Sequence, residues 1–125
     1  MYIAVDFDGT CVTPDGFGGV GTEKPFATEA LRTMVKMGHK LILWTCREDV
    51  PGDPYRQYLT EAKAWFQARG IPLAGVNETP VEREFRPDLK RKVFADLHID
   101  DRNLGGFPGW RQSLRMVREM TLQRS

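Results

Sequence analysis

Four short apolar runs, most of them separated by enough residues for a helix, constrain the fold of this chain. The runs cover residues 2–5, 40–44, 73–76 and 94–99. The first run, YIAV, shows no alternation of apolar and polar residues, which is typical of a strand buried on both faces of a parallel sheet. Parallel neighbours need crossovers of a dozen residues or more. The spacing therefore predicts an α/β fold with a central parallel sheet.

Apolar residues recur at helical spacing in three of the remaining segments. The expected helices run from near Pro25 to Gly38, from Asp53-Pro54 to Gly70, and over about 110–121. Asp53-Pro54 is a strong start signal, because a capping side chain precedes a proline at the first helical position. The glycine-rich residues 11–24 predict a loop or a small hairpin, and 77–92 predict a loop with one helical turn after Pro87.

Length and composition are those of an ordinary globular protein. A chain of 125 residues is large enough for one core, so residues 1–125 are expected to form a single domain. Lys and Arg number 18 against 17 Asp and Glu, so net charge gives no case for binding nucleic acid or a membrane. No apolar run approaches the roughly 20 residues of a membrane span, and no secretory signal is recognisable, so a cytoplasmic location is expected.

A few residues that invite a functional interpretation are expected to be structural instead. Cys11 and Cys46 are too few for a disulfide framework and are expected to be free thiols. His98 lies within the fourth apolar run and is expected to pack there. The three tryptophans are expected to face the core; they are Trp44, Trp65 and Trp110.

Polar residues follow each apolar run at the point where the strand should end. They are Asp6-Phe7-Asp8-Gly9-Thr10, Thr45-Cys46-Arg47, Asn77-Glu78 and Asp100-Asp101. In a parallel sheet these ends share one edge, which is where ligands bind. Carboxylates gathered there would repel one another unless a cation lay among them, and Mg²⁺ is the usual partner of such oxygen ligands. The sequence therefore predicts a magnesium site at this edge.

The Asp6–Asp8 pair can divide its chemistry between two roles. Side chains two residues apart lie on the same side of an extended chain, so one can serve as metal ligand and nucleophile and the other as acid and base. Gly9 allows the backbone to turn sharply so that its N–H groups face an anion.

This set of motifs resembles the haloacid dehalogenase (HAD) superfamily of phosphotransferases. The Asp-x-Asp-x-Thr motif is matched by Asp6 to Thr10, the Ser or Thr closing strand two by Thr45, and the final acidic pair by Asp100 and Asp101. The basic residue before the last core strand is assigned to Lys92, with Lys90 as its rival. The motifs occur in order and span residues 6–101, so the resemblance covers nearly the whole chain.

The resemblance implies a Rossmann-like, three-layer sandwich with helices on both faces of the sheet. It also implies a Mg²⁺-dependent phosphomonoester hydrolase. Asp6 would attack phosphorus to form an aspartyl-phosphate, and Asp8 would protonate the leaving oxygen and then activate water. Lys92 would neutralise charge on the nucleophile and phosphate.

The remaining residues of the motifs would hold the phosphate and the metal. The phosphoryl oxygens would be held by Thr45 and by backbone N–H groups near Phe7, Asp8 and Cys46, with Gly9, Thr10 and Arg47 completing that site. Mg²⁺ would be held by the Asp6 carboxylate, the Asp8 main-chain oxygen and Asp101, with Asp100 ligating through water or bracing the other ligands.

Neither the segment after Thr10 nor the one between Cys46 and Lys92 leaves room for a cap domain. The site is therefore expected to be open, as in the capless branch that acts on macromolecular phosphoesters, or on small ones when a neighbouring subunit closes the site. Basic residues at 83, 86, 90, 91 and 92 keep a nucleotide or nucleic-acid end as a narrower alternative, although acidic residues are interleaved with them.

Two other functions fit these residues less well than hydrolysis. A non-catalytic module that binds metal and phosphate has no need of a general acid, so Asp8 argues against it. A phosphomutase must exclude water from the intermediate, and without a cap nothing would do so.

Overall fold

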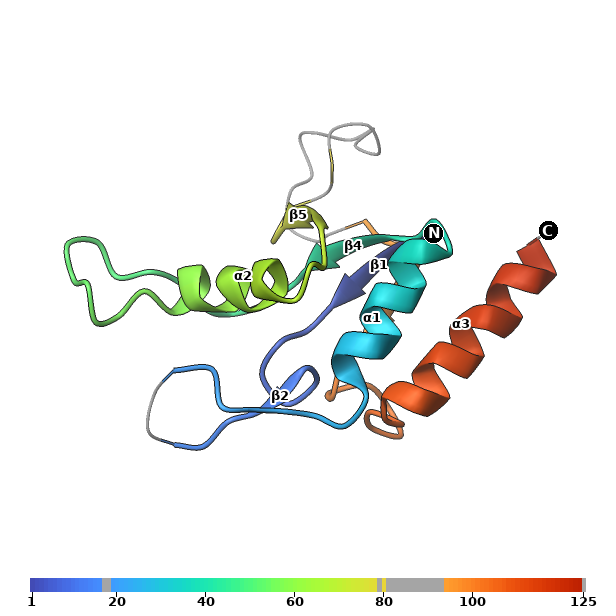
Figure 1. Cartoon of the computed structure of the whole chain (residues 1–125), viewed down its shortest axis with the longest axis horizontal. Helices are drawn as coiled ribbons and strands as arrows, with labels where there is room; N and C mark the ends of the chain where they lie inside the picture. The colour runs from blue at the N-terminus through green and yellow to red at the C-terminus, as the bar shows by residue number, and fades with distance from the viewer. Residues whose placement is uncertain (17–18, 79, 81–93, 125) are drawn as a thin grey trace.

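The chain has an α/β fold built on a four-stranded parallel sheet. The computed structural model describes residues 1–16, 19–78, 80 and 94–124. The strands are β1 (Tyr2–Val5), β4 (Lys40–Leu43), β5 (Leu73–Val76) and β6 (Leu97–Ile99), in the order β5-β4-β1-β6 (Figure 1). All pairs are parallel, as the sequence predicts, and β1 lies between β4 and β6.

A small hairpin follows β1 and accounts for the glycine-rich segment. Its strands are β2 (Val12–Thr13) and β3 (Thr22–Glu23), which pair antiparallel. Gly21 has a φ of 83°, and a Cβ there would overlap the carbonyl oxygen of Thr13. Glycine is therefore required where the second strand of the hairpin returns alongside the first.

The three helices are α1 (Ala27–Lys36), α2 (Tyr58–Ala68) and α3 (Trp110–Arg124). Helices α1 and α3 lie side by side (Figure 1). Buried residues from all three helices belong to one cluster with Ile3, Val5, Leu41 and Leu43, which alternate with Ala4 and Ile42 along the strands. In the described part of the chain the helices therefore share one face of the sheet, and the expected helices on both faces are not seen there.

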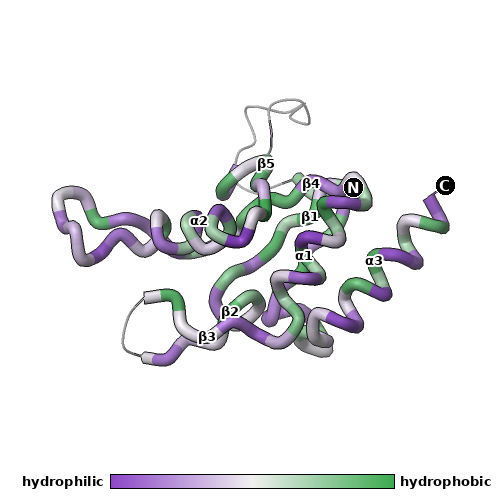
Figure 2. Tube along the Cα trace, viewed as in Figure 1, coloured by the Kyte–Doolittle hydropathy of each residue, from purple (hydrophilic) through white to green (hydrophobic). Residues whose placement is uncertain are grey.

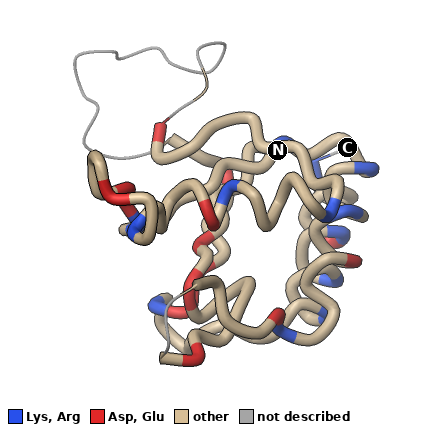
Figure 3. The backbone as a smooth tube through the Cα atoms, turned by 60° about the vertical axis from the view of Figure 1, so that its left-hand side comes forward, with Lys and Arg blue, Asp and Glu red and all other residues tan. Residues whose placement is uncertain are grey.

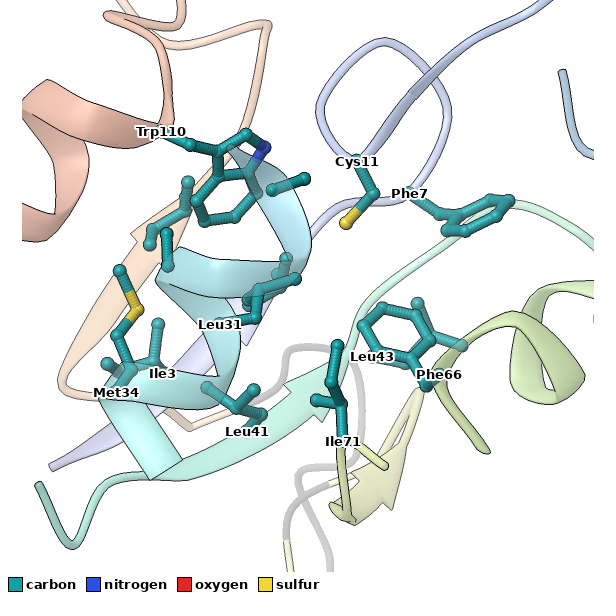
Figure 4. Close-up of a cluster of buried hydrophobic side chains, with 14 of the residues drawn as sticks. Ile3, Phe7, Cys11, Leu31, Met34, Leu41, Leu43, Phe66, Ile71 and Trp110 are labelled. Carbon is teal, nitrogen blue, oxygen red and sulfur yellow. The ribbon is translucent and has the colours of Figure 1, made fainter. Parts of the chain in front are cut away.

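The core beneath these helices is apolar and contains an aromatic group. Phe7 follows β1 and packs against two α2 residues, Trp65 at 5.6 Å and Phe66 at 6.0 Å between ring centroids. Figure 4 shows Phe7 and Phe66 on the α2 side of the cluster and Trp110 on the α3 side. Hydrophobic residues concentrate along β1, β4 and the inner turns of the helices (Figure 2). Trp65 and Trp110 are buried as predicted, while Trp44 is only half-buried.

Two strand predictions match the structure, and several boundaries differ. Helix α2 begins at Tyr58, not at Asp53, because the Asp53 carboxylate accepts a hydrogen bond from the Tyr55 N–H (2.9 Å) and so stabilises a turn. Helix α1 begins at Ala27, after Phe26 in a left-handed conformation (φ 67°). Strand β6 begins only at Leu97.

The remaining boundary differences are small. Helix α3 continues three residues beyond the predicted end, to Arg124. The helical turn expected after Pro87 lies outside the described residues. Within the described residues, no helix is both long enough and apolar enough to cross a membrane.

A hydrogen bond joins the start of α3 to the loop after β1. The indole Nε1–H of Trp110 donates to the carbonyl oxygen of Thr10 at 2.8 Å, and both residues are buried. Replacing Trp110 would leave a buried acceptor without its donor, and unsatisfied buried groups cost free energy. Helix α3 thus helps to fix the loop that carries the Asp-x-Asp motif.

We expect Trp110→Phe to lower the free energy of unfolding by about 1–3 kcal/mol, because the Thr10 carbonyl loses its donor and the core loses volume. Urea unfolding followed by circular dichroism measures this. Tyr55→Phe is the control, since Tyr55 is 90% exposed, and should change stability by less than about 0.5 kcal/mol. Equal stabilities for the two variants would contradict the proposed role of the bond.

His39 gives the fold a pH dependence. Its side chain is buried, and its ring nitrogens contact the Met1 amino group (2.8 Å) and the Thr121 hydroxyl (3.0 Å). Burial, and then the nearby ammonium charge, lower the pKa of His39 below its ordinary 6.5. The unfolded chain therefore binds a proton more readily than the folded protein.

We expect the free energy of unfolding to fall as the pH drops below about 6.5, because protonation of His39 favours the unfolded chain. Urea titrations at pH 7.5 and 5.5 should show a smaller pH effect in His39→Gln than in the wild type. An identical pH effect in both proteins would show that His39 does not contribute to it.

Candidate active site

The pairing of the strands aligns the polar residues that follow them. Val5 pairs with Leu43 on one side and with Ile99 on the other, and Leu43 pairs in turn with Val76. The residues that follow these positions therefore meet at the carboxyl edge of the sheet, as the sequence predicts. They include Asp6, Thr45, Asn77 and Asp100.

Three carboxylates gather at this edge. Asp6, Asp100 and Asp101 each offer an oxygen, and these oxygens lie within 4.8 Å of one another. In Figure 3 the acidic positions follow one another through the middle of the molecule, while the helix that ends at the C-terminus is mostly basic. The structure thus brings together the three predicted side-chain ligands. The Asp8 carboxylate points away from them and binds Arg47.

Gly9 is required for this approach. Its φ is 85°, and a Cβ at this position would overlap Oδ2 of Asp101. Any side chain at position 9 would therefore push Asp101 away from Asp6. Gly9 therefore has two roles, which are the predicted sharp backbone turn and the space it leaves for the Asp101 carboxylate.

The pKa of the Asp6 carboxyl group is raised to about 7. Partial burial is the main cause, and the charges of Asp100 and Asp101 add to it, against a lowering by the Thr10 hydroxyl, which donates to Asp6 Oδ2 at 3.0 Å. A bound cation would remove this repulsion. Clustered carboxylate oxygens are also the donor set that hard divalent cations prefer, so the residues present fit Mg²⁺.

The Thr10 hydroxyl contacts Asp6 and does not face the open edge of the site. It is fully buried, and its hydroxyl is bonded to Asp6. The prediction that Thr10 binds phosphate directly is therefore not supported by its position. Its contact instead orients the Asp6 carboxylate.

Hydrogen-bond donors are available beside the carboxylates. Towards the other described residues, the backbone N–H groups of Phe7, Asp8 and Cys46 donate no hydrogen bond. The Thr45 hydroxyl accepts from the Arg47 N–H at 3.2 Å, which leaves its own hydrogen free to donate. These four groups are the ones predicted to hold phosphoryl oxygens.

Asn77 positions Thr45. The side-chain oxygen of Asn77 accepts from the Thr45 N–H at 2.7 Å, and Asn77 itself has a φ of 54°. The sequence predicts that Asn77 lies at this edge and indicates no role for it. The sequence does carry a signal for this backbone conformation, because asparagine is among the few residues that tolerate a left-handed conformation directly after a strand.

Arg47 binds Asp8 instead of standing free for a phosphate. Its Nε and Nη2 atoms each donate to one carboxylate oxygen of Asp8, both at 2.8 Å. The same contact raises the pKa of Arg47. The resemblance implies that Arg47 binds phosphate, but the guanidinium N–H groups that would do so already donate to Asp8. Lys92 and its rival Lys90 lie outside the described residues.

The two cysteines are free and differ in environment. Cys11 is buried and Cys46 is exposed. Burial raises the pKa of the Cys11 thiol well above its ordinary value, and the charge of Asp6 adds to this. Cys11 is therefore a poor nucleophile in this fold.

We expect Asp6→Asn to raise the free energy of unfolding by about 1–2 kcal/mol in EDTA at pH 8, where the Asp6 carboxylate is charged and repelled by its neighbours. This expected gain in stability is small because the Asp6 carboxyl group is only half-buried, so water screens its charge. The sign follows from the raised pKa, since ionisation of Asp6 costs stability as the pH rises through about 7.

Adding Mg²⁺ should stabilise the wild type and have little effect on Asp6→Asn, as measured by thermal unfolding. Glu119→Gln, on the exposed side of α3, is the control and should respond to Mg²⁺ like the wild type. Equal stabilisation of all three proteins would show that the ion binds elsewhere.

Comparisons with known proteins find a similar solved structure. No family model matches the chain, and no curated protein matches it. Among solved structures, a conserved protein from Bacteroides thetaiotaomicron is 40% identical, with a match covering 96% of this chain and 91% of that protein and a TM-score of 0.79. At this identity and coverage, the chain belongs to the same family as this conserved Bacteroides protein.

Proposed function

We propose that the chain is a Mg²⁺-dependent phosphomonoester hydrolase of the HAD type that works through an aspartyl-phosphate on Asp6. The observation that carries this proposal is the meeting of three carboxylates with four available donors at one sheet edge. The carboxylates belong to Asp6, Asp100 and Asp101. A site that places a cation next to anion-binding N–H groups suits a phosphate ester.

The metal would be held by Asp6, Asp101 and the main-chain oxygen of Asp8, with Asp100 beside them. When bound, it supplies positive charge that allows a phosphate dianion to approach a carboxylate. The Thr45 hydroxyl and the N–H groups of Phe7, Asp8 and Cys46 would orient the phosphoryl oxygens for in-line attack.

The chemistry divides into two half-reactions on the chain's own carboxyl groups. In the first, an Asp6 oxygen forms a bond to phosphorus while the bond to the leaving oxygen breaks, and Asp8 gives that oxygen a proton. In the second, Asp8 takes a proton from water as the water oxygen attacks the phosphorus, which releases inorganic phosphate and restores Asp6. The hydrogen bond from Thr10 keeps Asp6 oriented throughout.

The bidentate contact of Arg47 favours a second candidate, a module that binds metal and phosphate without turnover. Both oxygens of Asp8 accept hydrogen bonds from Arg47, so one of them must be released before Asp8 can reach a leaving group. A site in which this release never occurs would bind phosphate and leave the ester intact.

We expect the purified protein to release phosphate from p-nitrophenyl phosphate in Mg²⁺ and not in EDTA. Asp6→Asn removes the nucleophile and should lower kcat at least 10³-fold, and Asp8→Asn should lower it by about 10²–10⁴-fold. Glu119→Gln should match the wild type. A panel of nucleotides, sugar phosphates and phosphorylated oligonucleotides extends the assay.

Failure of the wild type on the whole panel, while phosphate still binds in the presence of Mg²⁺, would reject hydrolysis in favour of the binding module. Failure of phosphate to bind at all would reject both candidates. Isothermal titration with inorganic phosphate, with and without Mg²⁺, separates these outcomes.

A further inference from the structure

The proposed general acid is held by an ion pair in this structure. Nε and Nη2 of Arg47 donate to the two carboxylate oxygens of Asp8, and hydrolysis requires that at least one of these oxygens be released. The Arg47 side chain is only 12% exposed. A guanidinium held in so little contact with water is costly to leave without a counter-charge. Release of Asp8 is therefore favoured by a second anionic partner for Arg47.

Glu61, in the first turn of α2, provides such a partner. Its Oε2 lies 3.7 Å from Nη1 of Arg47, which is longer than the 2.7–2.9 Å or so of a charge-assisted hydrogen bond. This oxygen is buried, and it accepts no hydrogen bond from the part of the chain that the structure describes. A buried acceptor without a donor is unfavourable, so Glu61 gains a bond if Arg47 moves towards it.

The two carboxylates contact opposite sides of the guanidinium. Nε and Nη2 form the edge that faces Asp8, and Nη1, the corner opposite this edge, is the atom nearest to Glu61. A shift of about 1 Å towards Glu61 would bring Nη1 within hydrogen-bond range and stretch the bonds to Asp8 beyond about 3.5 Å. The ring of Phe7 lies beneath the guanidinium, 4.9 Å from its central carbon, and offers a flat surface for this movement.

We propose that Glu61 is a positioning residue that draws the guanidinium of Arg47 away from Asp8 and so releases Asp8 for acid–base catalysis. This inference rests on the proposed function and deepens it. The structure then describes the resting arrangement, in which Arg47 restrains Asp8, and the reactive arrangement has Arg47 bound to Glu61. A module that binds phosphate without turnover has no use for this exchange, so Glu61 also separates the two candidate functions.

The first test uses the need of the leaving group for a proton. The value of kcat/KM reports the steps up to formation of the aspartyl-phosphate, where glycerol phosphate needs a general acid more than p-nitrophenyl phosphate does. Glu61→Gln should lower kcat/KM about tenfold or more for glycerol phosphate and less than about threefold for p-nitrophenyl phosphate. Glu48→Gln removes an exposed charge next to Arg47 in the sequence and should match the wild type. Equal losses on the two esters would overturn the role of Glu61.

Removing Arg47 gives the opposite sign. Arg47→Met frees Asp8, so kcat/KM for glycerol phosphate should equal or exceed that of the wild type, and adding Glu61→Gln should change it less than about twofold. A loss as large as that of Asp8→Asn would show that Arg47 supports Asp8 and would overturn the proposal. Arg47→Lys loses the two parallel bonds and keeps the charge, so it carries the same expectation if the methionine variant does not fold.

The second test needs no activity. Asp8→Ala removes the present partner of Arg47, so the guanidinium should move to Glu61. In protein without metal, Glu61→Gln should then lower Tm by about 3 °C or more in the Asp8→Ala background and by about 1 °C or less in the wild type. Equal shifts in the two backgrounds would show that Arg47 does not change partner and would overturn the proposal.

The two tests separate this inference from the function on which it rests. A wild type inactive on every ester would reject hydrolysis, and the catalytic role of Glu61 with it, whatever the thermal shifts. An active wild type whose Glu61→Gln variant loses the same factor on both esters would leave hydrolysis standing and reject only the role of Glu61.

Discussion

The parallel pairing of β1 with β4 and β6 is the constraint on which the candidate site depends. Because β1 lies between β4 and β6, the residues after it face the ends of strands on both sides. Asp6 donates its N–H to the carbonyl oxygen of Ile99 at 3.0 Å, which fixes the loop after β1 next to the loop after β6. A shift of one residue in this register would reverse the faces of β1 and separate Asp6 from Asp100.

Three carboxylates held this closely oppose folding, and the surrounding structure must offset their repulsion. Phe7, directly after Asp6, is buried against the aromatic residues of α2. Thr10 and Cys11 each donate a hydrogen bond to Asp6, one to its side chain and one to its backbone oxygen. The apolar and hydrogen-bonded interior beneath the motif thus maintains an edge that is electrostatically unfavourable without a cation.

The sequence predicts the framework well, because that framework depends on local pattern. Residues 2–5 and 73–76 are strands with the predicted bounds, since short apolar runs between polar residues carry a clear signal. The start predicted at Asp53 is wrong because the same capping side chain stabilises a turn equally well. The bond between Arg47 and Asp8 joins residues 39 positions apart, and no local pattern encodes such a contact.

The bond from Trp110 to Thr10 links residues 100 positions apart in the chain. During synthesis on the ribosome, the loop that carries Asp6 and Asp8 leaves the exit tunnel long before the indole that supports its carbonyl. Until α3 docks, that loop has the local bonds that the Thr10 and Cys11 N–H groups donate to the Phe7 carbonyl oxygen, and it lacks the one from the indole. The complete set of hydrogen bonds around the motif therefore requires the chain to be made at least as far as residue 110.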